Sequence, residues 1–338
     1  MWHVGIDLHL RTVVVAAVND CGEIRPVVHL ECADIEGIRR TFEELKPFRA
    51  VIEATGTYRW LHRLLCPMGA VLLAHPLRLR AMLVRRSKSD RLDSQLLAQL
   101  LRLNQIPLAY IPSEKFQMLR DLMRYRTTLG RQLAQVKLQL RQLLARENMG
   151  APYADPFGPR GLYWFSRQDF GVVGNQMRDH LLERFAWTSA QLKSVEDRMA
   201  ATAPEFPEIE ALLDLAGVGL FTALMVVAEF GDVERFRCAK QAAAYTGLTT
   251  RVFQSGESRR TGHISKQGSP WLRWVLVEAA MKLVSKDTKL ANFYQRIRKR
   301  SSNKIARVAS ARKLAEICWK RLRRWHHEHR PTVTEAAA

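Results

Sequence analysis

The sequence lacks any long apolar run, any closely spaced pair of cysteines and any segment typical of a secretory signal. No stretch approaches the roughly 20 apolar residues that a membrane-spanning helix needs, and no basic region precedes an apolar one at the N-terminus. The absence of a C-x-x-C pair disfavours a zinc ribbon or a disulfide scaffold and fits a reducing cytosol. The five cysteines are scattered: Cys21, Cys32, Cys66, Cys238 and Cys318. We therefore expect a cytoplasmic protein that makes no membrane contact.

Acidic residues are scarce between Arg235 and Arg330, where 24 lysines and arginines stand against 5 aspartates and glutamates. This segment carries almost all of the net charge of +20, because the rest of the chain has 29 basic and 28 acidic residues. Such an asymmetry indicates a nucleic acid or an anionic membrane surface as partner. Without an amphipathic anchor, nucleic acid is the favoured partner. A merely solvated surface would carry interleaved acids.

The first 110 residues alternate between strand and helix patterns. Three consecutive strands are predicted first, at Trp2–Leu8, Thr12–Val18 and Ile24–Leu30. Helices and strands then alternate, with helices at Asp34–Leu45, Thr57–Met68 and Asp90–Leu103 and strands at Ala50–Glu53 and Ala70–Ala74. This is the order of a ribonuclease-H-like domain, and actin-like sugar kinases are built in the same way. We therefore predict an α/β domain over residues 1–110.

The middle of the chain carries helix patterns only. Apolar residues recur at helical spacing through residues 113–149, which predicts one long amphipathic helix. Residues 151–174 are expected to link it to a second long helix at 176–199. Together the two helices predict a coiled coil or a helical hairpin. The first helix holds eight lysines and arginines and one acid from Lys115 to Arg146, so its polar face is either solvated or follows a phosphate backbone.

A helix-hairpin-helix is predicted near the start of the basic C-terminal region. Helical spacing of apolar residues from Ile209 to Ala223 is interrupted by a Leu-Ala-Gly-Val-Gly segment that contains Gly217 and Gly219. These glycines permit a tight turn that aims backbone N–H groups outward, where they can hold a phosphate. A turn that only joins two helices is the alternative. The predicted divisions are a helical connector at 111–203, a mostly helical basic domain at 204–330 and a disordered tail at 331–338.

Four carboxylates in the first hundred residues predict a metal site. Asp7 and Glu53 each end an apolar strand, and Asp90 and Asp93 share one helix face. Two negative charges so close together repel, which costs stability unless a bound cation or several basic side chains offset the repulsion. Arg86, Lys88 and Arg91 are the basic residues nearby that could do so without a metal. Oxygen ligands suit Mg²⁺, and two such ions would stabilise the attacking and leaving oxygens of a phosphodiester.

A second candidate site lies between Arg251 and Trp274, where glycines alternate with hydroxyl and basic residues. Its arginines would orient a phosphate, and their charge would favour the deprotonated form of a hydroxyl. The basic residues are Arg251, Arg259, Arg260, Lys266 and Arg273, and the hydroxyl candidates are Ser255, Ser258, Thr261 and Ser265. A basic loop that only grips backbone phosphates is the alternative.

Both groups of residues resemble those of the DEDD transposases, a bacterial insertion-sequence family described as bridge-RNA-guided serine recombinases. The N-terminal motifs are Gly5–Asp7, Glu53–Gly56 with Tyr58, and Lys88–Asp90 with Asp93. The C-terminal motifs are Leu215–Gly219, Tyr245–Leu248, Gln254–Gly256 and Gly262–Gly268. They stand in the family's order over residues 1–100 and 205–285, whereas the middle is similar only in its helical character. Ser269 stands where family members often have asparagine.

The resemblance implies a RuvC-like domain whose Asp7, Glu53, Asp90 and Asp93 bind Mg²⁺, and a C-terminal transposase domain with Ser255 as its nucleophile. It implies a structured non-coding guide RNA that pairs with double-stranded donor and target DNA. It also implies a homo-oligomer, a dimer or a tetramer, in which the carboxylates of one subunit act beside the serine of another. A bacterial cytoplasmic protein associated with the nucleoid is the expected setting.

The sequence therefore predicts a DNA recombinase that cuts and rejoins strands through a covalent phosphoserine. The first alternative is a RuvC-like nuclease that hydrolyses DNA without a covalent intermediate. A nucleic-acid-binding or architectural protein without activity is disfavoured by the intact set of carboxylates. A sugar kinase is disfavoured by the basic C-terminal region and by the helix-hairpin-helix.

Overall fold

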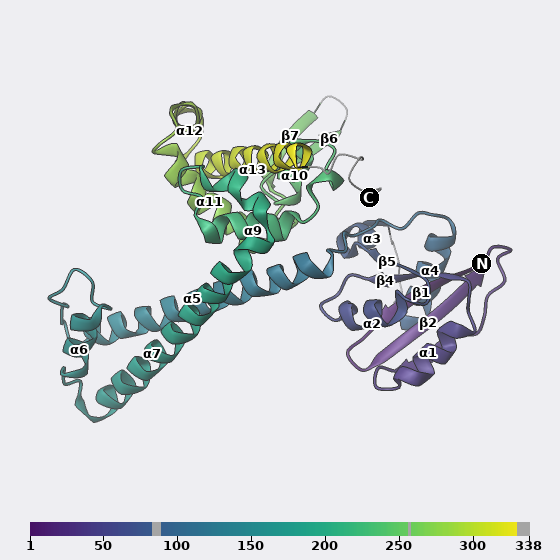
Figure 1. The fold of residues 1–338 in the computed structure, drawn as a ribbon, viewed down its shortest axis with the longest axis horizontal. Coiled ribbons are helices and arrows are strands. Elements are labelled where there is room, and N and C mark those ends of the chain that lie inside the picture. The colour runs from purple at the N-terminus through teal and green to yellow at the C-terminus, as the bar shows by residue number, and fades with distance from the viewer. Residues whose placement is uncertain (83–88, 256–257, 330–338) are drawn as a thin grey trace, which may run out of the picture. The chain divides into compact units, whose positions relative to one another are not determined.

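A computed structural model describes residues 1–82, 89–255 and 258–329 of the chain (Figure 1). Its contacts divide the chain into two compact units, Met1–Ile111 and Pro112–Ala338. The first unit is a mixed α/β layer structure and the second is mostly helical. The predicted α/β N-terminal region and mostly helical C-terminal part are therefore confirmed.

The N-terminal unit is built on a five-stranded sheet in the order β3-β2-β1-β4-β5. Strand β1 is antiparallel to β2 and parallel to β4, and β4 is parallel to β5. The strands are β1 Trp2–Leu8, β2 Thr12–Asn19, β3 Val28–Glu31, β4 Phe48–Glu53 and β5 Ala70–Ala74. The central strand β1 and its neighbour β2 are buried along most of their length, as a sheet covered on both faces requires.

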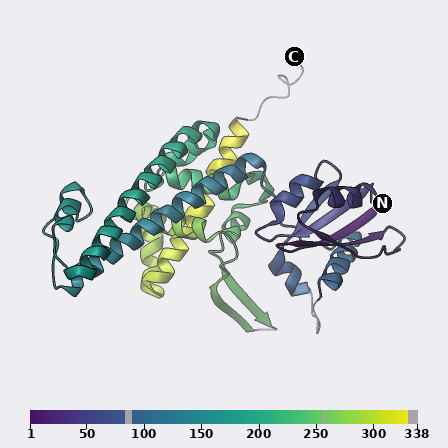
Figure 2. The same ribbon diagram turned by 90° about the horizontal axis from the view of Figure 1, so that it is seen from below.

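Helices cover both faces of this sheet (Figure 2). Alternate residues of a strand point to opposite faces, and Val4, Ile6 and Leu8 of β1 pack with residues of α1 and α2. The other face of the sheet packs with residues of α3 and α4. The helices are α1 Ile35–Glu43, α2 Tyr58–Leu65, α3 Pro76–Met82 and α4 Asp90–Arg102.

The third strand is shorter than the sequence predicted. Ile24 forms only an isolated bridge with Val18, and the continuous strand begins at Val28. Pro26 lies between them, and a proline has no N–H to donate to a sheet. Helix α3 is a second difference, since the sequence patterns did not predict it.

The C-terminal unit begins with two long helices, α5 Glu114–Arg146 and α7 Gly171–Thr202, which pack along one another. We call this pair the helical arm (Figure 1). Helix α6, Pro159–Ser166, lies at its end in the segment predicted as a linker. Phe157 and Phe165 pack there with apolar residues of α5 and α7. A coiled coil in the strict sense stays a prediction.

A compact helical body follows the arm and shares its core. Helix α9 is buried from Ala223 to Phe230, and its cluster includes Leu119 of α5 and Met199 of α7. The remaining helices are α8 Glu210–Leu213, α10 Ala239–Tyr245, α11 Pro270–Val284, α12 Thr288–Arg300 and α13 Asn303–Glu328. Short 3-10 turns lie at Ala203–Glu205, Pro207–Ile209 and Val233–Arg235. Across the described residues, no helix combines the length and apolar character needed to cross a membrane.

A β-hairpin interrupts this helical body between α10 and α11. Its strands are β6 Thr250–Ser255 and β7 Ser258–Ile264, which pair antiparallel with an irregularity near Thr250. The sequence patterns predicted no strands in this segment, so the hairpin is a new feature. Its polar composition and the full exposure of β6 explain why the patterns missed it, because no buried face gives the strand an alternating pattern.

Candidate active site

Asp7 and Glu53 lie at the same end of two neighbouring parallel strands. Ile6 of β1 pairs with Ile52 of β4, so the next residue of each strand emerges at the same edge of the sheet. Side chains two residues apart on a strand lie on the same face of the sheet. Val51 of β4 packs against α4, so Glu53 lies on the face that α4 covers, and Asp7 lies on the same face. The side chain of Asp7 is only 16% exposed.

Gly5 allows helix α4 to approach β1 very closely. A Cβ atom on Gly5 would lie 2.0 Å from the carbonyl oxygen of Ser94 and 2.4 Å from the amide nitrogen of Ala98. Any other residue would therefore push the helix away from the strand. The approach brings the first turn of α4, which carries Asp90 and Asp93, to the end of β1.

The N-terminus of α4 suits two acids. Ser89 caps the helix, its Oγ accepting a hydrogen bond from the backbone N–H of Leu92 at 3.3 Å. Asp90 and Asp93 occupy the first turn, where the helix dipole stabilises negative charge. Arg86 and Lys88, which the sequence analysis named as possible counter-charges, lie outside the described residues, and Arg91 is exposed.

His9 joins the carboxylates of β1 and α4. Its Nε2 lies 3.2 Å from Oδ2 of Asp7 and 3.2 Å from Oδ2 of Asp90. One ligand atom from each of these three residues lies within 4.8 Å of the others. His9 was not predicted from the sequence. Its position two residues after Asp7 keeps it on the same side of the chain, but only the packing of α4 shows that it meets Asp90.

Burial and neighbouring charges act together on Asp7. Burial raises its pKa most strongly, the charge of His9 lowers it, and the charges of Asp90 and Asp93 raise it again. A cation at this cluster would relieve both the burial of the charge and the repulsion. Carboxylate oxygens with one imidazole therefore form a donor set that fits a divalent ion. Glu53 reaches this edge of the sheet from β4.

Ser255 ends strand β6 and is exposed. It pairs across the hairpin with Ser258, and Phe253 pairs with Arg260. Arg251 donates a hydrogen bond from Nη2 to the carbonyl oxygen of Ser265 at 3.3 Å. Gly256, which follows Ser255 in the motif, lies outside the described residues. The serine and the carboxylates belong to different compact units, so each half of the predicted site is described by itself.

Arg273 holds the base of the hairpin. Its Nη1 donates to the carbonyl oxygens of Thr246 at 3.2 Å and of Gly268 at 3.0 Å. Burial lowers the pKa of its guanidinium. These two contacts hold the base of the hairpin together, and phosphate binding by Arg273 stays a prediction. Lys266, with φ of 53°, donates its backbone N–H to the carbonyl oxygen of Gly247 at the same base.

Gly217 and Gly219 form the turn before α9. Gly217 has a φ of +85°, and a Cβ there would lie 2.5 Å from Cβ of Lys282 on α11. The positive φ and the lack of room for a Cβ atom both require glycine at 217, so the glycine is explained without a phosphate. A Cβ on Gly219 would meet nothing within 4 Å. Phosphate binding by this turn stays a prediction, as does a helix-hairpin-helix.

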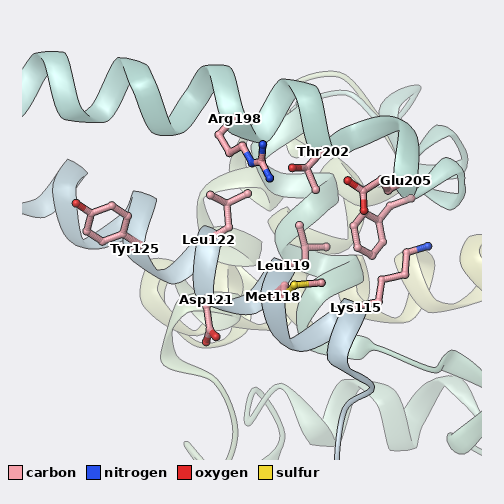
Figure 3. A pocket seen from close by; sticks show the side chains of 10 residues that line it. Lys115, Met118, Leu119, Asp121, Leu122, Tyr125, Arg198, Thr202 and Glu205 are labelled. Carbon is pink, nitrogen blue, oxygen red and sulfur yellow. The ribbon is translucent and has the colours of Figure 1, made fainter.

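A cavity of about 410 Å³ lies at the base of the helical arm, where α5 faces the C-terminal end of α7 (Figure 3). Its wall carries two cations, Lys115 and Arg198, and two carboxylates, Asp121 and Glu205. This balance favours neither an anionic nor a cationic ligand. None of the predicted site residues lines the cavity, so it is separate from the candidate site.

Comparison with known proteins matches both ends of the chain to one family. A family model described as "Transposase", for the DEDD domain of IS110 elements, matches residues 4–149. A second, described as "Transposase IS116/IS110/IS902 family", matches residues 209–295. The first match contains all four carboxylates, and the second contains the hairpin with Ser255.

Relatives extend the similarity over nearly the whole chain. The "Putative transposase y4qE" of Sinorhizobium fredii is 28% identical over 327 residues, which cover 94% of this chain and 78% of the relative. The "Probable family 20 transposase" of Pseudomonas aeruginosa is 26% identical over 303 residues, or 85% and 87%. The transposase for insertion sequence element IS1111A of Coxiella burnetii is 32% identical over 133 residues, or 38% and 36%. The two family models match in order, and together with the names of these relatives they support an IS110/IS116-family DEDD transposase.

Proposed function

We propose that this transposase cuts and rejoins DNA by transesterification, with Ser255 forming a covalent bond to a DNA phosphate. The observation that carries the proposal is the convergence of Asp7, His9 and Asp90 at the end of β1. This cluster supports phosphodiester chemistry. The exposed serine on a basic hairpin supports a protein nucleophile in place of water.

The residues of the chain have separable tasks in this reaction. Asp7, Glu53, Asp90 and Asp93 would hold Mg²⁺, which when bound polarises the scissile phosphate and stabilises the oxygen charges that develop. Arg251 lies on the same strand as Ser255, and Arg260 lies on the strand paired with it. Their positive charge favours the deprotonated hydroxyl and orients the phosphate.

The proposed reaction needs no external energy source, because each bond that breaks is replaced by one of the same kind. Oγ of Ser255 loses its proton and bonds to phosphorus, while the bond from phosphorus to the 3′-oxygen breaks and that oxygen takes a proton. In the reverse step, the 3′-hydroxyl of another strand attacks the phosphoserine and Ser255 leaves, regaining its proton. One phosphoester replaces another at each step, so the bond energy is kept for rejoining.

The proposal includes partners that match this chemistry. Donor and target DNA are the substrates, and a structured guide RNA selects them by base pairing. The excess of 24 basic over 5 acidic residues between Arg235 and Arg330 supports binding of such polyanions. A homo-oligomer would let the carboxylates of one subunit serve the serine of another.

A hydrolytic nuclease is the competing function. The carboxylate cluster comes from the N-terminal unit alone, so water could serve as nucleophile without any residue of the hairpin. The two functions differ in one product, since only transesterification leaves DNA covalently attached to protein.

The test uses the purified protein with its co-purified nucleic acid and end-labelled DNA from the region flanking its gene. Denaturing gels should show a protein–DNA adduct that Ser255→Ala abolishes. Ser258→Ala is the matched control, because Ser258 lies directly across the hairpin and should leave the adduct intact. Adducts that persist in Ser255→Ala and vanish in Ser258→Ala would move the nucleophile to Ser258. Cleavage without any adduct would favour the nuclease.

A further inference from the structure

The β6–β7 hairpin exposes an aromatic ring beside the predicted nucleophile. Every residue of β6 is exposed, and Phe253 is 60% exposed. Figure 2 shows the two strands projecting as a ribbon from the helices of their unit. Covering this ring with a partner would therefore be favourable.

The register places this ring on the same face as Ser255. Directly paired residues of antiparallel strands share a face, and so do residues two apart on one strand. Phe253 pairs with Arg260, and Ser255 pairs with Ser258. One face of the ribbon therefore carries Phe253, Ser255, Ser258 and Arg260.

Gly262 and Arg251 lie next to the same ring. A Cβ on Gly262 would lie 3.0 Å from Cε2 of Phe253 and 3.8 Å from Cβ of Arg251. The missing side chain at 262 leaves room for the ring to lie over the opposite strand. Val252, 49% exposed, alternates to the other face.

The chemistry of this face fits a nucleic acid strand. Two arginines flank the ring, and residues 250–255 and 258–264 contain no carboxylate. A cationic surface with an exposed ring binds single-stranded nucleic acid through phosphate contacts and base stacking. The bases of an intact duplex already stack on each other, so only an unstacked base offers its face to Phe253.

We propose that Phe253 stacks on an unstacked DNA base next to the phosphate that Ser255 attacks. The inference rests on the proposed function for the role of Ser255. Two residues of a strand span about 7 Å, roughly twice the 3.4 Å step between stacked bases. A base on Phe253 therefore belongs to a nucleotide within about two steps of the phosphate at Ser255. Phe253 is a positioning residue that holds the strand open at the cut.

The experiment measures binding of the full chain to a mixed-sequence single-stranded DNA by fluorescence anisotropy. Phe253→Leu keeps apolar bulk but removes the ring, and should weaken binding about ten-fold. Phe253→Trp should bind at least as tightly as the wild type. Val252→Ala is the matched control, because it shortens an exposed side chain on the opposite face, and should bind as the wild type.

A second measurement locates the contact. Iodouracil in the same DNA should crosslink on illumination to a peptide that contains Phe253, and the crosslink should disappear in Phe253→Leu. Wild-type affinity in Phe253→Leu would overturn the proposal. Equal weakening in Phe253→Leu and Phe253→Trp would also overturn it. Tryptophan keeps an aromatic ring, so binding would then not depend on stacking.

These outcomes are independent of the covalent step. Adduct formation by the wild type together with unchanged binding in Phe253→Leu would refute the stacking and leave the proposed function standing. Weakened binding in Phe253→Leu, with no adduct formed by the wild type, would support stacking and refute the covalent mechanism.

Discussion

Gly5 of β1 and Ser94 of α4 are in such close contact that a Cβ atom on Gly5 would lie 2.0 Å from the Ser94 carbonyl oxygen. The contact sets the distance between strand and helix, and that distance brings Asp90 to the same histidine nitrogen as Asp7. The absence of a side chain at Gly5 thus sets the geometry of the candidate metal site.

Gly5→Ala should therefore disturb both stability and cation binding. Because the methyl group meets backbone atoms, which cannot rotate away, the cost should reach about 3 kcal/mol. Urea denaturation measures it. Gly150→Ala is the control, since a Cβ there meets nothing within 4 Å. Equal stability of the two variants would show that α4 shifts freely, and the packing argument would fail.

Divalent cations should stabilise the folded protein through the carboxylate cluster. At about 100 times the Kd, Mg²⁺ or Mn²⁺ should add about 2.7 kcal/mol to the free energy of unfolding. Thermal denaturation with and without a chelator measures the effect. Asp7→Asn should abolish the response, whereas Glu36→Gln should retain it, because Glu36 lies on α1 across the sheet.

The same Asp7→Asn variant should be more stable than the wild type in chelator. Burial and the charges of Asp90 and Asp93 raise the pKa of Asp7, so its charged form is disfavoured in the folded state. The amide removes that penalty. A variant less stable than the wild type in both conditions would argue that the carboxylate has a structural role and is not a cation ligand.

Much of this geometry was predictable, and the limits have physical causes. Strand and helix patterns placed Asp7, Glu53, Asp90 and Asp93 on the elements that carry them. His9 gave no signal, because a lone histidine after a strand acquires meaning only when α4 folds against β1. The hairpin was missed because an exposed ribbon has no apolar alternation. Helix α6 was missed because the prolines and glycines in and around it are typical of loops.

Arg273 and Arg260 should differ in their effects on DNA binding. Arg260→Gln should lower the salt dependence of binding by about one unit of slope, as loss of one phosphate contact does. Arg273→Gln should leave the slope unchanged, because its guanidinium donates to Thr246 and Gly268. It should instead speed hydrogen exchange at the hairpin base. A reduced salt slope in Arg273→Gln would show that Arg273 also contacts a phosphate.

Glu229 should be essential for joining the helical arm to the body. Its side chain is 2% exposed and binds Arg124, with Oε1 3.0 Å from Nε and Oε2 3.2 Å from Nη2. Arg120 also donates to the carbonyl oxygens of Ala228 and Glu229. The buried Arg120 also lies with its Nε 4.0 Å from Oε2 of Glu229. Glu229→Gln leaves this buried cation poorly compensated and should cost about 3 kcal/mol. Denaturation in urea measures this loss.

The exposed pair Lys193–Asp197 supplies the control for that experiment. Its side chains are 76% and 65% exposed, so Asp197→Asn should change stability little. Similar losses of stability in Glu229→Gln and Asp197→Asn would show that the buried Glu229 does not stabilise the junction between the arm and the body.

The central claim is that Ser255 carries the DNA during strand exchange, and peptide mapping tests it most directly. Protein trapped with its DNA substrate would be denatured, digested with nuclease and protease, and analysed by mass spectrometry. We expect a nucleotide attached to the Ser255 hydroxyl. Nucleotide attached to a different residue, or cleaved DNA with no modified peptide, would contradict it.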